Sequence, residues 1–391
     1  MQDKKDKLIY IFIYLYIYNS FIFMKELEYG LYIHVPFCTS KCSYCNFYAI
    51  PISVFSTYDT SVINEWKNRQ LAWPLTPHTI FIGGGSPSLL KTTHLKNIIK
   101  NINTCAQEIS IEINPEHAKL KYILDLKQLG ISRVSLGVQS FNNNLLKFLN
   151  RSHEKKTILN AISNISMSNF KSVSIDIIIG LEKTINTTTL EYCINKINHI
   201  SIYPLQIKQL TPLNRKKRIR NIEENSISNL KNLNIFFKKY KILQYELSNF
   251  AQKNHECIHN KSYWDSHNYI GLGPSAHSMK TLPDGSRLRS HNSFDIQQYT
   301  KSQKLSFYEE YLSPKESFLE SCWIGLRNLQ NGINLSDILN QHKLPIQIIS
   351  KILLVLKSSC LETKYNVKFK KSQYGYYKHT FYNIMKMINS I

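Results

Sequence analysis

The chain of 391 residues is long enough for two domains, and its 43% hydrophobic and 19% charged residues exclude wholesale disorder. Its formal net charge of +22 would suit a nucleic-acid or acidic-ligand binder. Lys, Asn, Ile and Tyr are abundant along the whole chain, however, so we attribute most of this charge to the codon bias of an AT-rich genome. Eight Cys in a chain of this length do not make a disulfide scaffold.

Residues 1–23 contain an apolar run at 8–18 that follows three lysines. The order of charge and apolarity resembles a signal sequence, but no small-residue cleavage site follows. The run is also short for a membrane span of about 20 residues. Met24 begins a sequence that looks like a natural start. We therefore expect residues 1–23 to be a dispensable extension or a mis-assigned start, with a membrane anchor or a targeting segment as alternatives.

Six short apolar segments alternate with segments of helical period, and they predict parallel strands that are buried on both faces. Helical stretches begin near Tyr58, Leu95, Ile158 and Leu190. This alternation predicts an α/β fold whose sheet is either open or closed into a (β/α) barrel. In both cases the functional loops follow the carboxyl ends of the strands. The predicted strands are Gly30–Val35, Thr79–Gly83, Ile109–Asn114, Arg133–Val138, Val173–Ile179 and Leu205–Leu210.

The alternation stops before the last quarter of the chain. Residues 313–316 read Ser-Pro-Lys-Glu, a capping box with Pro at the first helical position. Apolar spacing predicts another helix at Ile349–Leu356, and the tail from Thr363 could form two short strands. We therefore expect a main domain over residues 24–285 and a smaller, mostly helical C-terminal domain over 286–391.

Three cysteines lie close together in the loop after the first strand, at Cys38, Cys42 and Cys45. Structural zinc and ordinary electron-transfer iron–sulfur clusters both require four protein ligands. Three thiolates on a cubane would leave one iron open to another ligand, and a zinc knuckle is the alternative. The remaining cysteines are expected to be buried thiols. They are Cys105, Cys193, Cys257, Cys322 and Cys360.

The pattern Cys38-x3-Cys42-x-Tyr44-Cys45 resembles the signature of the radical S-adenosylmethionine (SAM) superfamily. Longer segments at 32–47, 81–90, 259–264 and 269–278 resemble the oxygen-independent coproporphyrinogen oxidase-like family, and within it the HemW-type haem chaperones. The resemblance implies a partial (β/α)6 barrel with a smaller, mostly helical C-terminal domain. It also implies a [4Fe–4S] cluster whose open iron is chelated by SAM.

Phe47 separates two classes within this resemblance. Coproporphyrinogen III dehydrogenases carry a fourth Cys two residues after the third, and the haem chaperones carry an aromatic residue there. Here that position is Phe47. The resemblance therefore implies a haem chaperone that delivers haem to acceptor haemoproteins. A coproporphyrinogen III dehydrogenase is the alternative, a zinc-stabilised binding protein is a weaker one, and enzymatic activity stays open.

The resemblance also assigns ligand positions one by one. Glycine at the turn allows close approach, and exposed N–H groups there are expected to bind the carboxylate or amino group of SAM. The expected cluster ligands are Cys38, Cys42 and Cys45. The expected SAM contacts are Tyr32, Tyr44, Gly84, Gly85, Ser86 and Glu112. Further ligand-binding positions are Gln139, Arg151 and Asp176. The expected haem contacts are His259, Tyr263 and Trp264.

The expected partners are haem or another porphyrin, acceptor haemoproteins and an electron donor for the cluster. No nucleic acid is expected, because the basic run at residues 215–220 lacks interleaved aromatic residues and is better explained as a solvated loop. Membrane contact is allowed but not required. An exposed cluster would be lost in air, so the chain is expected in a reducing, cytoplasmic compartment.

Overall fold

The computed structural model describes most of the chain from Tyr29 onwards. The N-terminal extension, the helix expected at Ile349–Leu356 and most of the basic run lie outside the described residues, as does the side chain of Cys360. The described ranges are 29–51, 57–71, 76–102, 105–215, 220–301, 307–347, 360–363 and 366–369.

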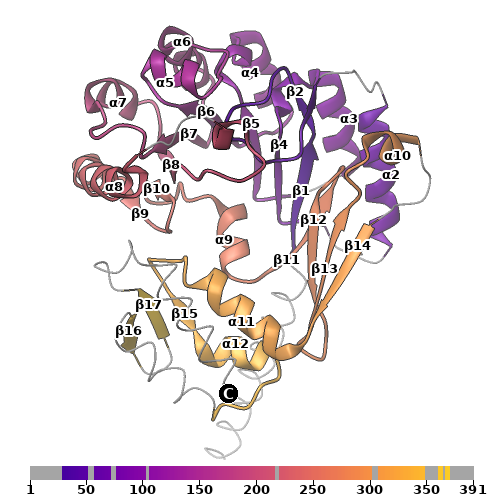
Figure 1. The fold of residues 1–391 in the computed structure, drawn as a ribbon. Coiled ribbons are helices and arrows are strands. Elements are labelled where there is room, and N and C mark those ends of the chain that lie inside the picture. The colour runs from indigo at the N-terminus through magenta and orange to yellow at the C-terminus, as the bar shows by residue number, and fades with distance from the viewer. Residues whose placement is uncertain are drawn as a thin grey trace, which may run out of the picture.

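Six parallel strands form the centre of the molecule, and they are neighbours in the order in which they occur in the chain (Figure 1). Five of them coincide with strands predicted from the sequence, so the α/β fold is confirmed. The strands are β1 (Tyr29–Val35), β4 (Thr79–Gly84), β5 (Glu108–Ile113), β6 (Arg133–Gln139), β7 (Ser172–Ile179) and β8 (His199–Pro204).

The sixth predicted strand is wrong. Residues 205–210 form no strand, and the strand ends at Pro204. Leu205 is buried, but Ile207 is exposed and Leu210 is 93% exposed, so the apolar pattern of this segment does not continue into the core. The true strand reads His-Ile-Ser-Ile-Tyr-Pro, and a search for continuous apolar runs overlooks such an alternation.

We expected the central strands to be apolar on both faces, but they are apolar on one face only. Strand β5 reads Glu-Ile-Ser-Ile-Glu-Ile, and β7 begins Ser-Val-Ser-Ile-Asp-Ile. Successive side chains point to opposite faces of a strand. One face therefore carries Ile and Val, while the other carries buried polar groups. Ser135 on β6 donates to Asp176 on β7, so polar side chains of neighbouring strands meet on this face.

Helices cover the apolar face of the sheet, and their buried Leu and Ile residues form one core with the strands (Figure 1). Burial of this apolar surface is the main force that holds helices and sheet together. The helices are α2 (Tyr58–Gln70), α3 (Thr92–Ile102), α4 (Leu120–Gln128), α5 (Asn143–Phe148), α6 (Lys155–Ser166), α7 (Thr187–Ile194) and α8 (Ile222–Lys238). Short 3₁₀ turns are η1 (Pro87–Leu89), η2 (Pro115–His117) and η3 (Pro212–Arg215).

Further strands extend the sheet at both edges. Beyond β8 lies β10 (Asn249–Ala251), which runs antiparallel to β8. Next to it, β9 (Leu243–Gln244) runs antiparallel to β10. On the other side, β11 (Asn268–Leu272) runs parallel to β1. Three antiparallel strands then complete the sheet, namely β12 (His277–Thr281), β13 (Arg287–Asn292) and β14 (Phe307–Leu312).

Residues after 286 therefore contribute strands to the main sheet as well as helices. The polar sequence of β13, Arg-Leu-Arg-Ser-His-Asn, hides this strand from a search for apolar runs. The capping box at Ser313 is confirmed. The other elements of this region are α10 (Ile296–Lys301), α11 (Pro314–Gly325), α12 (Leu335–Gln341), β15 (Ile333–Asn334), β16 (Cys360–Thr363) and β17 (Asn366–Phe369).

One short helix, α9 (Ile258–Trp264), lies below the central strands and above α11 and α12 in Figure 1. It contacts the first residues of β4 and β5, so it covers the amino ends of the strands. The loop with the three cysteines follows the carboxyl end of β1. In the part of the chain that the structure describes, no helix is both long and apolar enough to cross a membrane.

Candidate functional site

The three cysteines lie in a loop that is closed at its base. Strand β2 (Phe37–Cys38) pairs with β3 (Ile50–Pro51), and the N–H of Ile50 donates to the carbonyl of Pro36 at 2.8 Å. Within the loop, the N–H of Cys45 donates to the carbonyl of Cys42 at 3.2 Å. All three cysteines are free and partly exposed. Partial burial raises the pKa of the Cys38 and Cys45 thiols.

Among the described residues, no three His, Cys, Asp or Glu side chains converge closely enough to hold a single metal ion. A cubane makes a different demand, since each thiolate binds a separate iron. Of the other cysteines, Cys193, Cys257 and Cys322 are buried as expected. Cys105 is exposed, so the expectation of burial was wrong for that residue.

The segment after α5 holds the cysteine loop from outside. The N–H of Ser43 donates to the carbonyl of Leu149 at 3.0 Å, and the Ser43 hydroxyl donates to the carbonyl of Phe148 at 3.1 Å. The side-chain amide of Asn150 donates to the carbonyl of Lys41 at 2.9 Å. Sequence reasoning missed these anchors, because nothing in the loop's own residues identifies a partner about one hundred positions away.

Arg151 continues the same segment and points at the cysteines. Its Nη1 donates to the Cys42 sulfur at 3.3 Å, and its Nη2 donates to Asn114 Oδ1 at 2.8 Å and to the carbonyl of Gly137 at 3.2 Å. Its buried Nε has no partner among the described residues. The guanidinium thus places a fixed positive charge beside the cysteine loop, which suits an anionic ligand.

Gln139 lies at an irregular point of β6 and shares this region with Arg151. The pairing of β6 with β7 shifts register between Leu136 and Gln139, and Gln139 has a positive φ of 64°. A Cβ on Gly137 would lie 3.2 Å from Gln139 Nε2 and 3.4 Å from Arg151 Nη2. The bulge and the missing side chain thus bring the two polar groups together. A non-glycine residue in this conformation is strained, and such strain clusters at functional sites.

The glycine turn at the end of β4 packs tightly against the cysteine loop. A Cβ on Gly85 would lie 2.6 Å from the Phe37 carbonyl and 3.0 Å from the Cys38 sulfur, so only glycine fits. The N–H of Gly84 donates to Glu112 Oε2 at 3.2 Å, and that of Gly85 donates to the Val35 carbonyl at 2.7 Å. The N–H groups expected to be open to SAM are therefore already engaged.

Ser86 and the two expected tyrosines lie around the same loop. The Ser86 hydroxyl lies 3.6 Å from the Cys38 sulfur and accepts from Asn114 Nδ2 at 2.9 Å. The Tyr32 hydroxyl lies 3.0 Å from His34 Nδ1. Tyr44 borders Cys42, and its pKa is raised, mainly by burial.

Two half-buried acids, Glu112 on β5 and Asp176 on β7, interact on the polar face of the sheet. Burial, and then the charge of Asp176, raise the pKa of Glu112 to about 8, although the N–H of Gly84 opposes this. Asp176 accepts from the Ser135 hydroxyl, and burial raises its pKa too. Glu112 therefore stays largely protonated at neutral pH, and a cationic ligand between the two acids would be stabilised.

The three residues expected to contact haem lie at the opposite end of the strands. They belong to α9, which covers the amino ends, whereas the cysteines follow a carboxyl end. A strand of six residues spans roughly 20 Å. The structure therefore separates the expected haem contacts from the cysteine loop by about the length of a strand.

His259 is fully engaged in this position. Its Nδ1 lies 2.8 Å from the Thr79 hydroxyl and its Nε2 lies 2.9 Å from the Tyr263 hydroxyl. Burial, with a smaller contribution from His78, lowers its pKa to about 3. Trp264 stacks under Arg327, whose guanidinium carbon lies 4.4 Å from the ring centre. Haem could reach His259 only if α9 left the strand ends.

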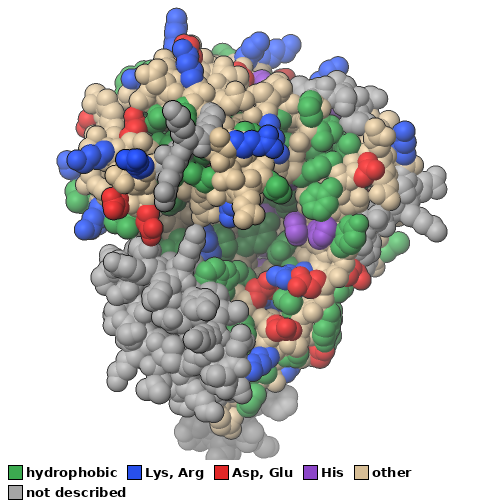
Figure 2. Space-filling model, viewed as in Figure 1, with side chains coloured by type: hydrophobic (Ala, Val, Ile, Leu, Met, Phe, Trp, Pro, Cys, Tyr) green, Lys and Arg blue, Asp and Glu red, His purple; other side chains and the backbone are tan. Residues whose placement is uncertain are grey.

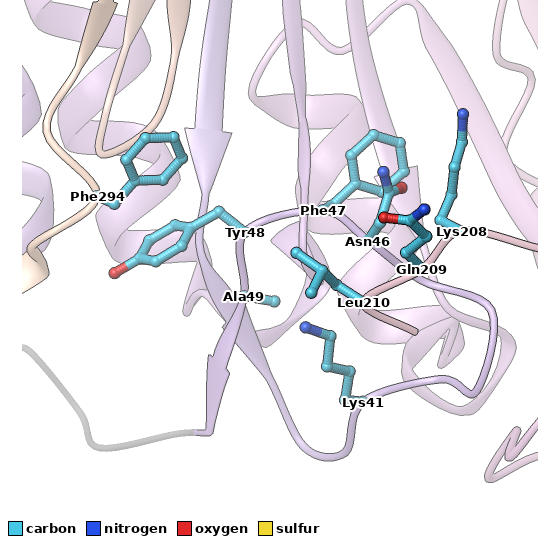
Figure 3. Close-up of a pocket in the computed structure, with 9 residues that line it drawn as sticks. All are labelled: Lys41, Asn46, Phe47, Tyr48, Ala49, Lys208, Gln209, Leu210 and Phe294. Atoms are coloured by element: carbon cyan, nitrogen blue, oxygen red, sulfur yellow. The ribbon is translucent and has the colours of Figure 1, made fainter. Parts of the chain in front are cut away.

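A cavity of about 540 Å³ opens beside the cysteine loop (Figure 3). Phe47, in the position of the absent fourth Cys, is 65% exposed and lines it. Figure 3 shows Tyr48 and Phe294 on one side and Lys208 on the other. Its lining is Lys41, Asn46, Phe47, Tyr48, Ala49, Lys208, Gln209, Leu210 and Phe294.

Several known proteins are similar to this chain in sequence. Residues 32–191 match the radical SAM superfamily. A heme chaperone HemW of Buchnera aphidicola subsp. Schizaphis graminum is 34% identical over 304 residues, covering 74% of this chain and 80% of the relative. The heme chaperone HemW of Escherichia coli is 30% identical over 284 residues, covering 67% and 72%.

A solved structure agrees on the fold. The coproporphyrinogen III oxidase HemN from Escherichia coli, described as a radical SAM enzyme, superposes with a TM-score of 0.75 over 92% of this chain and 90% of that one, at 19% identity. At this identity the match supports the shared fold alone. The extent and identity of the HemW matches carry the conclusion that this chain belongs to the HemW-type haem chaperone family of the radical SAM superfamily.

Proposed function

We propose that this protein is a haem chaperone that binds a [4Fe–4S] cluster, SAM and haem and delivers haem to acceptor haemoproteins. The observation that carries the proposal is a loop with three free thiols, held from outside and flanked by Arg151, that borders a cavity with aromatic and basic side chains. The names of the relatives support the same reading.

Cys38, Cys42 and Cys45 would each bind one iron of the cluster. The surroundings fit such a group: Gly85 leaves room beside Cys38, and the Arg151 guanidinium balances negative charge at Cys42. Such a cluster would supply an electron for reductive chemistry on bound SAM, and the three thiolates would hold it in place. An electron donor is therefore a proposed partner.

The residues around the loop would hold SAM from several sides. Tyr44 and Ser86 flank the thiols, Tyr32 lies on β1 with its hydroxyl 3.0 Å from His34 Nδ1, and the N–H of Gly84 in the glycine turn donates to Glu112. Arg151 Nε is a buried donor without a partner in the described chain, and it suits a carboxylate. Gln139 and Asp176 offer an amide and a carboxyl group for hydroxyl or ammonium groups.

Anaerobic reconstitution tests the proposal. We expect iron and sulfide to load in the wild-type chain, and haem to bind with a Soret band distinct from that of free haem. A protein that takes up zinc and no iron under strict anaerobiosis, or that binds no haem, would contradict it.

The second candidate is tested in the same preparation by adding coproporphyrinogen III, SAM and a reductant. Because Phe47 stands where the dehydrogenases carry a fourth Cys, we expect no decarboxylation. Turnover to protoporphyrinogen would identify the chain as a coproporphyrinogen III dehydrogenase instead.

A further inference from the structure

Segments that are far apart in the chain build the cavity beside the cysteine loop. They are the end of that loop at residues 46–49, the segment after β8 at residues 208–210, and Phe294, which follows β13. Lys41 completes the lining from within the loop (Figure 3). The volume of about 540 Å³ lies within the range of roughly 300–1,000 Å³ that is usual for small-molecule sites. The cavity is therefore large enough for a ligand of cofactor size.

Large apolar side chains border the cavity and are open to solvent. Phe47, Leu210 and Phe294 are each at least half exposed. Figure 2 shows hydrophobic side chains beside a hollow on one face of the molecule. A single exposed apolar side chain is ordinary, whereas several around one cavity mark a place where a ligand covers them. These three side chains favour a ligand with a broad apolar surface.

Contacts within the protein hold the aromatic wall of the cavity. The ring of Tyr48 meets that of Phe294 edge-on, at 5.7 Å between centroids and an angle of 72°. His34 Nε2 donates to the Tyr48 carbonyl at 2.9 Å, which ties this wall to β1. A wall that is already ordered loses little conformational freedom on binding. It therefore suits a rigid, planar ligand.

The charged groups of the lining are all basic. Lys41 and Lys208 carry the charge, and none of the nine described residues that line the cavity is Asp or Glu. SAM has a sulfonium and an ammonium group against a single carboxylate, so its net charge is positive and this lining disfavours it. A porphyrin with two carboxylates has the opposite charge, and Lys ammonium groups bind carboxylates. Charge complementarity thus selects a porphyrin over SAM as the occupant.

The described lining offers no strong ligand for haem iron. The usual protein ligands are His, Cys, Met and Tyr side chains, and of these the described lining contains only Tyr48. Burial is the main cause that raises the pKa of Tyr48, so its hydroxyl stays protonated at neutral pH. The ring of His291 lies 5.3 Å from that of Phe294, between centroids, but His291 does not line the cavity. Affinity would therefore come from the macrocycle and its carboxylates.

We propose that this cavity binds a dicarboxylate porphyrin by its flat face and its carboxylates, independently of the metal. Phe47, Leu210 and Phe294 cover the macrocycle, and Lys41 and Lys208 meet the carboxylates. The inference rests on the proposed function and places its haem site at the cysteine end of the strands, away from α9. A haem held in this way keeps its iron free of a strong protein ligand. The iron can then bond to a residue of an acceptor haemoprotein before the haem leaves.

Titrations of the full anaerobic chain with haem and with metal-free protoporphyrin test this site. We expect the wild type to bind the two with dissociation constants within about threefold of each other. In Leu210→Asp we expect both affinities to fall at least about tenfold, because an acid then faces the macrocycle and its carboxylates. Since Leu210 is almost fully exposed, the substitution should leave the unfolding midpoint unchanged. Leu124→Asp, an exposed leucine on the outer helix α4, is the matched control and should change neither affinity.

The outcomes separate this inference from the proposed function. A wild-type chain that binds no haem contradicts both. Binding of haem without binding of the metal-free porphyrin would show that iron ligation carries the affinity, and it would overturn the inference alone. Unchanged affinities in both Leu210→Asp and Phe47→Ala would overturn it as well. A loss of haem binding in His259→Ala, with those two variants unaffected, would place the haem at α9 instead.

Discussion

The two ends of the central strands differ in the exposure of their polar side chains and in the hydrogen bonds that these side chains make. At the amino end, Glu108 accepts from the Cys257 thiol at 3.3 Å, from the N–H of Ile258 at 3.1 Å and from the N–H of His259 at 3.2 Å. At the carboxyl end, the three thiols are partly exposed, Arg151 Nε has no partner among the described residues, and a cavity opens beside the loop.

The difference lies in how the polar groups of the two ends are satisfied. At the buried end Glu108 and His259 have hydrogen-bond partners, while Trp264 Nε1 has none among the described residues. The open end keeps reactive and charged groups accessible to water or to a ligand, and the buried Arg151 Nε is the donor there for which a missing partner is costly. The four predictions below test this contrast, beginning with the largest expected effect.

Cys38→Ala should abolish the cluster, because a cubane held by three thiolates loses one of its protein ligands. We expect iron after anaerobic reconstitution to fall from about four atoms per chain to near none. Without the cluster, the variant and the wild type should unfold at the same midpoint, since the substitution does not touch the contacts of α9. Cys105→Ala, an exposed thiol outside the loop, is the control. Full iron loading in Cys38→Ala would contradict the assignment.

Glu108→Gln should weaken the buried end. A carboxylate that receives several donors is replaced by an amide whose NH₂ faces them, at a cost of about 2 kcal/mol in the free energy of unfolding. Urea denaturation measures this. Glu310→Gln removes an exposed ion pair with Arg289 and should cost less than about 0.5 kcal/mol. Equal effects of the two changes would mean that α9 is not held by Glu108.

His259→Phe should flatten the dependence of stability on pH. The ordinary pKa of 6.5 applies in the unfolded chain, whereas burial lowers it to about 3 in the folded one. Between these values the unfolded chain binds the extra proton, so stability is complete above pH 6.5 and falls as the pH decreases towards 3. The wild type should lose up to about 1.4 kcal/mol per pH unit more than the variant.

Denaturation series from about pH 7 to pH 4 measure that difference. Other buried histidines, such as His199, titrate in both proteins, so only the difference between the two series reports His259. If the free energy of unfolding depends on pH in the same way in both proteins, His259 is accessible to protons in the folded chain. Haem binding at α9 would then be supported.

Lys208→Gln should have the smallest effect. An exposed charge near a carboxylate contributes about 0.2–1 kcal/mol, so haem affinity should fall less than about fivefold. The dimethyl ester of haem carries no carboxylates and should bind both proteins equally. Lys238→Gln, on the distant helix α8, is the matched control. A loss of the same size with the ester would show that Lys208 does not meet a carboxylate.

Much of the fold was predictable because its apolar periodicity is strong. Five of six strands coincided with predictions, and the glycine turn and the cysteine loop fell at the carboxyl ends as the βα alternation requires. The misses share one cause. Strands β8 and β13 carry polar residues on one face, so a search for continuous apolar runs passed over them.

The candidate site was predictable only where spacing encodes it. The three cysteines are close in sequence, so their proximity follows from the chain itself. The contacts of Arg151 with Cys42, and of Asn150 with the loop backbone, join residues about one hundred positions apart. The burial of His259 depends on Gly30, whose missing side chain makes room for the imidazole, and no local pattern reveals such a pairing.

The anchoring of the cysteine loop has a consequence for how the cluster is acquired. Backbone groups of Phe148 and Leu149 hold Ser43, so contacts within the protein fix the backbone of the loop. On the proposed function, cluster loading would be a bimolecular step between a folded acceptor and an iron–sulfur donor, separate from chain folding. Its rate should rise with donor concentration, and the energy of cluster binding is not spent on ordering the loop.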